Sequence, residues 1–145
     1  FDVDLVVVDD CGVGGGVTDR LSEMNIEVIP FNGAEASVNP LYLNRRCEAY
    51  YKLKEWFDKG WLKILADKGL QDQLMSIKFK YRSNGQKQIL SKDEMRKEGM
   101  KSPDRADSLC MAVFFSERTF EKAKMLAYGD SSADLLHPVY AEGCK

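Results

Sequence analysis

The sequence lacks the side chains that several common kinds of site require. Its 145 residues include one histidine, His137, and the four cysteines contain no C-x-x-C pair: Cys11, Cys47, Cys110 and Cys144. Because structural zinc sites are built from clustered Cys and His side chains, we do not expect one here. We expect the cysteines to be reduced and to act as small hydrophobic residues of a cytosolic protein.

Long apolar runs and an excess of positive charge are also missing. No stretch approaches the length of a membrane-spanning helix, and residues 1–4 are acidic, unlike a signal peptide, so we expect no membrane partner. The formal net charge of -2 excludes binding to nucleic acid through bulk charge, so any such contact requires a local basic patch. Phe1 is not an initiator Met, and we therefore expect a piece of a longer protein.

The chain is nevertheless suited to a folded domain, since 44% of its residues are hydrophobic. The valine run of residues 6–8 is followed by Asp9, Asp10 and a glycine-rich turn. An apolar run without polar alternation predicts a central strand of a parallel sheet, covered on both faces. Ligands of such sheets bind beyond the carboxyl ends of the strands, which is where both carboxylates lie.

The pattern predicts an α/β domain. We expect a strand over residues 1–10, a helix over 17–24 and a strand over 26–31, which together form a parallel βαβ unit. The longest helix is expected over 40–59, with Asn39 as N-cap. Its buried face is marked by apolar spacing: Leu43, Cys47, Tyr50, Leu53 and Phe57. Gly60 is expected to end it.

The second half of the chain is expected to contain a β-hairpin between helices. The expected elements are a helix over 67–74, a hairpin over 77–90 turning at Asn84-Gly85, a helix over 92–99, a helix that starts at Ser102-Pro103 with Ser102 as N-cap, and a separate helix over 116–128. Residues 130–145 have no periodicity and are expected to be a tail.

Asp107 shares a helix face with Cys110 and Phe114, so it is expected to point toward the sheet. A carboxylate there is costly unless it is paired, hydrogen-bonded or bound to a cation. If this helix packs beside the first strand, Asp9 and Asp107 converge. Oxygen ligands without histidine or thiolate suit Mg²⁺ or Mn²⁺, and two such ions could promote phosphodiester hydrolysis.

Other carboxylates fit this site less well. Strand alternation sends Asp9 and Asp10 to opposite sides, and we favour Asp9 as the ligand, although Asp pairs at strand ends also start turns. Asp104 is explained by its place in the first turn of the helix, where a negative charge interacts favourably with the helix dipole. Asp10 and Asp104 are therefore the less favoured ligands.

The glycine turn and the hairpin are candidate DNA contacts. The turn lacks the Lys-Ser/Thr of a P-loop and the third glycine of a dinucleotide fingerprint, so we expect Gly14 and Gly15 to lie near a DNA phosphate instead. Residues 78–105 carry nine cations against four anions. The hairpin cations are expected to follow a phosphate backbone: Lys78, Lys80, Arg82 and Lys87. The alternative is a solvated face that blocks edge pairing.

Three stretches in order, residues 7–21, 44–50 and 102–109, resemble motifs of the nuclease domain of tailed-phage large terminase subunits. The resemblance implies a ribonuclease H-like fold, a mixed sheet flanked by helices, here with an added β-hairpin. It also implies a metal-dependent endonuclease that cuts double-stranded viral DNA during genome packaging, with Asp9 and Asp107 as the second and third acidic ligands.

The resemblance also implies what lies outside the chain. The first acidic ligand would precede Phe1, so we expect residues 1–115 to be part of a nuclease domain that cleaves weakly or not at all alone, followed by a C-terminal helix and tail over 116–145. The implied partners are double-stranded DNA, an ATPase motor domain in the same polypeptide, the small terminase subunit and the portal. The implied location is the cytoplasm of the infected bacterial host.

Two other functions stay open. One is another ribonuclease H-like nuclease, such as a Holliday-junction resolvase. The other is a non-catalytic α/β module that binds nucleotide or protein through the glycine turn.

Overall fold

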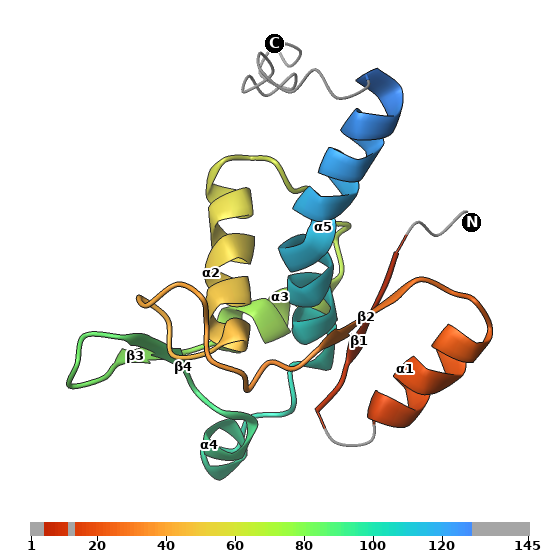
Figure 1. Cartoon of the computed structure of the whole chain (residues 1–145). Coiled ribbons are helices and arrows are strands. Elements are labelled where there is room, and N and C mark those ends of the chain that lie inside the picture. The colour runs from red at the N-terminus through yellow and green to blue at the C-terminus, as the bar shows by residue number, and fades with distance from the viewer. Residues whose placement is uncertain (1–4, 12–13, 129–145) are drawn as a thin grey trace.

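The computed structural model describes residues 5–11 and 14–128, with side chains as far as 116. It is an α/β structure, as predicted (Figure 1). In chain order the elements are β1 (Val6–Asp9), α1 (Gly14–Glu23), β2 (Val28–Phe31), α2 (Arg45–Asp58), α3 (Lys68–Ser76), β3 (Phe79–Tyr81), β4 (Lys87–Ile89), α4 (Lys92–Lys97) and α5 (Asp104–Tyr128).

The predicted βαβ unit is confirmed. β1 and β2 pair in parallel from Val6↔Val28 to Asp9↔Phe31, and α1 connects them. Figure 1 shows α1 on one side of these strands and α5 on the other, and both helices contact β1. The expected full burial of β1 is wrong, because all four of its residues are only half-buried. Among the described residues β2 is the only strand beside it, and α1 contributes no buried side chain.

The core lies where α2 and α5 pack side by side (Figure 1). Its buried members come from β2, α2, β4 and α5: Phe31, Cys47, Ala49, Tyr50, Leu53, Ile89, Ala106, Cys110, Val113 and Phe115. Three of the five residues predicted for the buried face of α2 are in this core. Phe57 is exposed instead, and Leu43 precedes the helix.

The predicted start of α2 at Pro40 is wrong. Asn44, not Asn39, is the N-cap, and its side chain accepts a hydrogen bond from Cys47 N at 3.0 Å. The preceding residues pair with β4 instead, since Lys87 N donates to Leu41 O and Leu43 N donates to Lys87 O. Because of this long-range pairing, the helix begins about one turn later than predicted. The predicted end is confirmed at Gly60, whose φ of 69° suits only glycine well.

The predicted hairpin and the two short helices are also confirmed. β3 and β4 pair antiparallel around a turn with Gly85 at φ 82°. Asp67 caps α3, and Ser91 and Glu94 form a capping box at α4. In the described residues the hairpin is an antiparallel sheet separate from the parallel β1–β2 pair, in agreement with a hairpin added to the main sheet.

The start of α5 differs from the prediction in how it is capped. The amide oxygen of Gln73, from α3, accepts hydrogen bonds from Arg105 N at 2.9 Å and Ala106 N at 3.1 Å. The hydroxyl of Ser102, the predicted cap, contacts Asp104 Oδ1. The expected break near 116 is wrong as well, because α5 is one helix to Tyr128. The division at 115/116 therefore falls inside a helix and stays a prediction, and the expected tail lies outside the described residues.

The described helices include none that is long and apolar enough to cross a membrane. Cys11, Cys47 and Cys110 are free thiols, and Cys144 lies outside the described residues.

Candidate metal centre

Asp107 is a buried carboxylate held from one side by α2. Its Oδ1 accepts a hydrogen bond from Tyr50 Oη at 2.7 Å and another from Arg46 Nε at 3.1 Å. The Asp107 side chain is 11% exposed and that of Arg46 is 15% exposed. Arg46 also donates through Nη1 to Leu90 O at 3.0 Å, which ties α2 to the segment that leads into α4. Asp107 therefore does not pay the cost of an unpaired buried charge.

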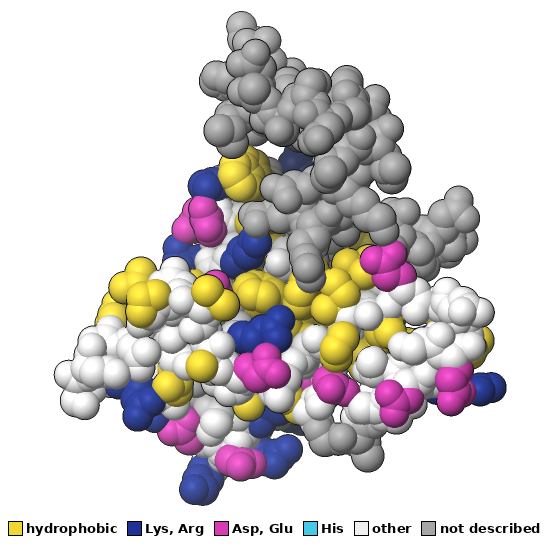
Figure 2. Space-filling model, viewed as in Figure 1, with side chains coloured by type: hydrophobic (Ala, Val, Ile, Leu, Met, Phe, Trp, Pro, Cys, Tyr) yellow, Lys and Arg dark blue, Asp and Glu magenta, His cyan; other side chains and the backbone are white. Residues whose placement is uncertain are grey.

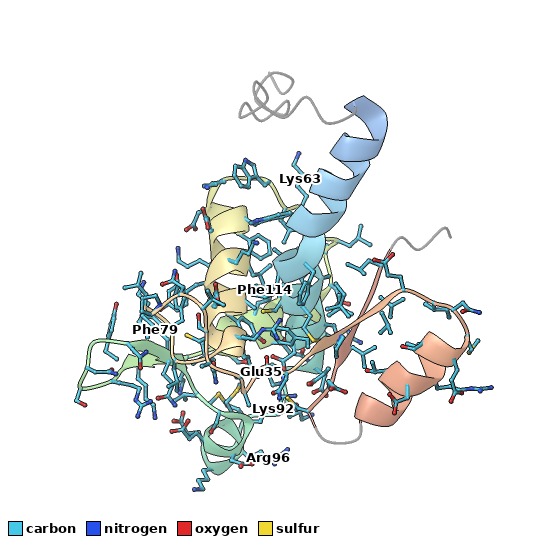
Figure 3. All side chains as sticks on the ribbon, in the orientation of Figure 1. Glu35, Lys63, Phe79, Lys92, Arg96 and Phe114 are labelled. Carbon is cyan, nitrogen blue, oxygen red and sulfur yellow. The ribbon has the colours of Figure 1, made fainter. Side chains whose placement is uncertain are left out.

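The other oxygen of Asp107 is bonded differently. Oδ2 is buried and has no hydrogen-bond partner of good geometry among the described residues. It lies 3.3 Å from the ammonium of Lys92, in the first turn of α4. The same ammonium lies 3.5 Å from Asp9 Oδ2, at the carboxyl end of β1. In Figure 3, Lys92 lies where the start of α4 approaches the end of β1.

Asp9 and Asp107 thus meet at one cation, although 98 positions separate them in the sequence. Both line a cavity of about 230 Å³, together with Lys92 and Arg46. The described residues contain no group of three or more His, Cys, Asp or Glu side chains that could hold a metal ion. The two carboxylates are therefore at most part of a metal site.

The electrostatics of the centre follow from burial and from these two carboxylates. Burial alone lowers the pKa of Lys92, but the charges of Asp107 and Asp9 outweigh it and raise that pKa above its ordinary value. Burial, and then the Asp107 charge, raise the pKa of Tyr50 far above its ordinary value. At neutral pH, Lys92 is therefore a cation and Tyr50 is a protonated hydrogen-bond donor.

The less favoured carboxylates lie elsewhere. Asp10 faces α1, where Thr18 Oγ1 lies 3.5 Å from its Oδ1. Asp104 is exposed at the start of α5 and does not line the cavity. Gly14 lies where a Cβ would approach Asp9 O to 1.9 Å, so the close passage of α1 against β1 requires glycine at this position.

The cations of the hairpin are not equally free. Lys78 pairs with Glu98 at 2.7 Å, and Lys80 pairs with Glu94 at 2.5 Å. The hydrogen bond from Lys80 is the largest cause that lowers the pKa of Glu94 to about 2. The ammonium of Lys87 lies over the Tyr51 ring, 4.5 Å from its centroid. Arg82 is exposed and forms no ion pair with a described residue.

Three residues of the centre escaped the sequence analysis as site residues: Arg46, Tyr50 and Lys92. Arg46 and Tyr50 are four apart and share one face of α2, with the guanidinium 5.2 Å from the ring centroid. The sequence offered one signal for both residues, namely an arginine one turn before a tyrosine on a helix face that is otherwise apolar. Lys92 gave none, because its role depends on the placement of α4.

No protein-family model and no curated protein matches the sequence. Among solved structures, the chain is similar to the nuclease domain of the large terminase subunit gp2 of bacterial virus Sf6. The TM-score is 0.62 at 23% identity, over 77% of this chain and 65% of that chain. A K428A mutant of that domain with manganese matches with the same TM-score and identity, over 77% and 66%. The same mutant with calcium matches over 77% and 65%.

The chain has the fold of a terminase nuclease domain. The ribonuclease H-like fold expected from the resemblance is thereby confirmed. The chain spans 66% of the length of the solved domain in the manganese structure.

Proposed function

We propose that the chain is part of a divalent-metal-dependent endonuclease, the nuclease domain of a phage large terminase subunit, which cuts double-stranded DNA during genome packaging. The observation that carries the proposal is the convergence of Asp9 and Asp107 on one ammonium, at the carboxyl end of β1. The shared fold, and the manganese and calcium named for the Sf6 domain, support it.

The residues present fit a hard cation. Both ligands are carboxylates, the donor type that Mg²⁺ and Mn²⁺ prefer, and Asp107 Oδ2 is a buried acceptor with no hydrogen bond of good geometry from a described residue. Two carboxylates do not complete such a site, so further ligands would come from water, from the DNA phosphate and from an acidic residue that precedes Phe1. Two bound ions would supply an activated water and would stabilise the leaving oxygen.

The chain's own residues would prepare the site for that cation. Asp9 and Asp107 provide two negative charges, and Lys92 neutralises part of that charge. Because the Lys92 side chain is 36% exposed, its ammonium can move toward solvent when a divalent ion takes its place. Tyr50 and Arg46 remain behind Asp107 and keep its charge compensated.

We propose that DNA is bound by the hairpin and by the start of α1. The candidate residues are Lys78, Lys80, Arg82, Lys87, Gly14 and Gly15. Lys78 and Lys80 are paired with acids of α4, and Figure 2 shows positive and negative side chains next to each other around that helix. Arg82 is the exposed hairpin cation without such an ion pair among the described residues, and we expect it to contribute most.

The same proposal includes the wider assembly. An ATPase motor domain in the same polypeptide, the small terminase subunit and the portal would be the partners, and the cytoplasm of the infected host would be the location. The fold shared with the Sf6 large terminase domain supports this assignment.

The test is manganese-dependent cleavage of a supercoiled plasmid. It is measured for the chain and for a version extended upstream of Phe1. We expect cleavage by the extended version, weak or no cleavage by the chain alone, and loss of cleavage in Asp9→Asn and Asp107→Asn. Asp104→Asn, in the same helix turn but outside the cavity, is the matched control and should retain activity.

Full activity after both site substitutions would contradict the proposal. Cleavage of four-way junctions but not of linear duplex would instead identify a resolvase. Nucleotide binding without metal-dependent cleavage would identify a binding module.

A further inference from the structure

The two oxygens of Asp107 have different surroundings, and this difference is the starting observation. Both donors from α2, Tyr50 Oη and Arg46 Nε, converge on Oδ1. Oδ2 has no hydrogen bond of good geometry among the described residues and lies 3.3 Å from Lys92 Nζ. Oδ1 is thus held by two donors of α2, while Oδ2 faces the ammonium of Lys92 in the cavity.

The donor side of this arrangement is rigid. Tyr50 is 7% exposed and belongs to the core, on the same face of α2 as Cys47 and Leu53. Burying its hydroxyl is costly unless the hydroxyl is hydrogen-bonded. The 2.7 Å bond to Asp107 satisfies it. Arg46 stacks against the Tyr50 ring and is tied to Leu90 O, so neither donor can follow the carboxylate if it rotates.

We propose that Tyr50 is a positioning residue: by holding Oδ1 it fixes the Asp107 carboxylate so that Oδ2 is the oxygen presented to a divalent cation. The inference rests on the proposed function, since it concerns the same metal site. A hydrogen-bond donor behind a ligating group orients that group, and its loss typically lowers metal affinity by roughly 10- to 100-fold.

The alternative is a purely structural role, in which Tyr50 stabilises the fold without affecting the cation. The two roles predict different measurements. A structural role lowers the melting temperature of Tyr50→Phe and leaves its metal affinity unchanged. A positioning role lowers the affinity for metal, and the loss depends on the presence of Asp107.

The experiment measures Mn²⁺ binding to the version extended upstream of Phe1, the same version used in the cleavage test, by electron paramagnetic resonance of the free ion, without DNA. The variants are Tyr50→Phe, Asp107→Asn and the double variant. Tyr51→Phe is the matched control, because it removes the same atom from the next residue of α2, whose ring packs on Tyr42 and Phe79. Arg46 Nε still donates to Asp107 in Tyr50→Phe, so we expect this variant to fold. Each titration is run well below the variant's melting temperature, as followed by circular dichroism.

We expect Tyr50→Phe to raise the Mn²⁺ dissociation constant by roughly 10-fold or more, and Tyr51→Phe to leave it unchanged. Asp107→Asn should weaken binding strongly, and adding Tyr50→Phe to it should change nothing further.

Two other outcomes are separable. If the wild-type chain binds Mn²⁺ through Asp107 but Tyr50→Phe binds within twofold of it, the positioning role is overturned and the proposed function stands. If binding does not depend on Asp107 at all, the proposed function fails, and this inference fails with it.

Discussion

Replacing Lys92 by glutamine should change the stability of the metal-free protein and its metal affinity in opposite directions. The ammonium of Lys92 lies 3.3 Å from Asp107 Oδ2 and 3.5 Å from Asp9 Oδ2. Glutamine keeps a stem of similar length and removes the charge. Without metal, two carboxylates then face each other across the cavity with no cation between them. With metal, the competitor for the site is gone.

The magnitude follows from these distances and from exposure. At an effective dielectric constant near 20, each pair is worth about 5 kcal/mol of Coulomb energy before solvent is considered. Lys92 is 36% exposed and Asp9 is 39% exposed, so screening and desolvation reduce this strongly, and exposed pairs measure about 0.2–1 kcal/mol. Since Asp107 is buried, we expect about 1–2 kcal/mol for both pairs together. The same energy corresponds to a gain of roughly 5- to 30-fold in Mn²⁺ affinity.

The assay combines thermal unfolding with a Mn²⁺ titration. Lys92→Gln should unfold at a lower temperature than wild type without metal, and Mn²⁺ should raise its melting temperature more than that of wild type. Lys97→Gln, an exposed residue of α4 that forms no ion pair with a described residue, is the control and should behave like wild type. Weaker Mn²⁺ binding by Lys92→Gln would refute the reasoning, because it would make Lys92 a supporting group and not a competitor.

Two further predictions concern the cap of α5 and the hairpin. Gln73→Ala should lower the free energy of unfolding by about 1 kcal/mol, because the Gln73 side chain accepts hydrogen bonds from two backbone N–H groups at the start of α5. Ser102→Ala should have little effect on it. Urea unfolding of both variants checks this, and a larger loss in Ser102→Ala than in Gln73→Ala would contradict it. Arg82→Ala should weaken binding to duplex DNA and reduce the salt slope by about 1, measured by fluorescence anisotropy at several salt concentrations. Lys80→Ala should change the slope less, since its ammonium is already paired with Glu94, and an equal loss in both variants would argue against Arg82 as the main contact.

Local patterns predicted most of the elements and one important long-range relation. The alternation around Asn84-Gly85 specified the hairpin, and the valine run followed by glycines specified the βαβ unit. Asp107 was expected to point toward the sheet because it shares a helix face with Cys110 and Phe114, and to meet Asp9 if its helix packs beside the first strand. The structure brings Asp107 and Asp9 to the same ammonium, which is the geometry that this reasoning required.

What could not be predicted depends on contacts between distant segments. Residues 41–43 have a sequence that suits a helix, but they pair with Lys87, which only the placed hairpin can provide. Gln73 of α3 caps α5, and no sequence pattern near the start of α5 could predict a cap that comes from another helix. Locally, Lys92 is one cation of a charged helix, and only the position of the start of α4 in the fold brings its ammonium to Asp9 and Asp107.

The distribution of charge around Asp107 argues for an exchangeable cation and not for a permanent salt bridge. A buried carboxylate that served structure alone would have hydrogen bonds at both oxygens, since an unsatisfied acceptor is costly. Here the permanently charged Arg46 and the protonated Tyr50 are both on the closed side, at Oδ1. On the open side, the part of the chain that the structure describes supplies one ammonium, that of Lys92, whose side chain is 36% exposed. Such an ammonium can leave without exposing apolar surface, because its hydrated head moves only a short way to water. Asp9 and Asp107 share the ammonium of Lys92, and a divalent cation can compete with it for the two carboxylates. We therefore expect the chemistry at this centre and not at the glycine turn.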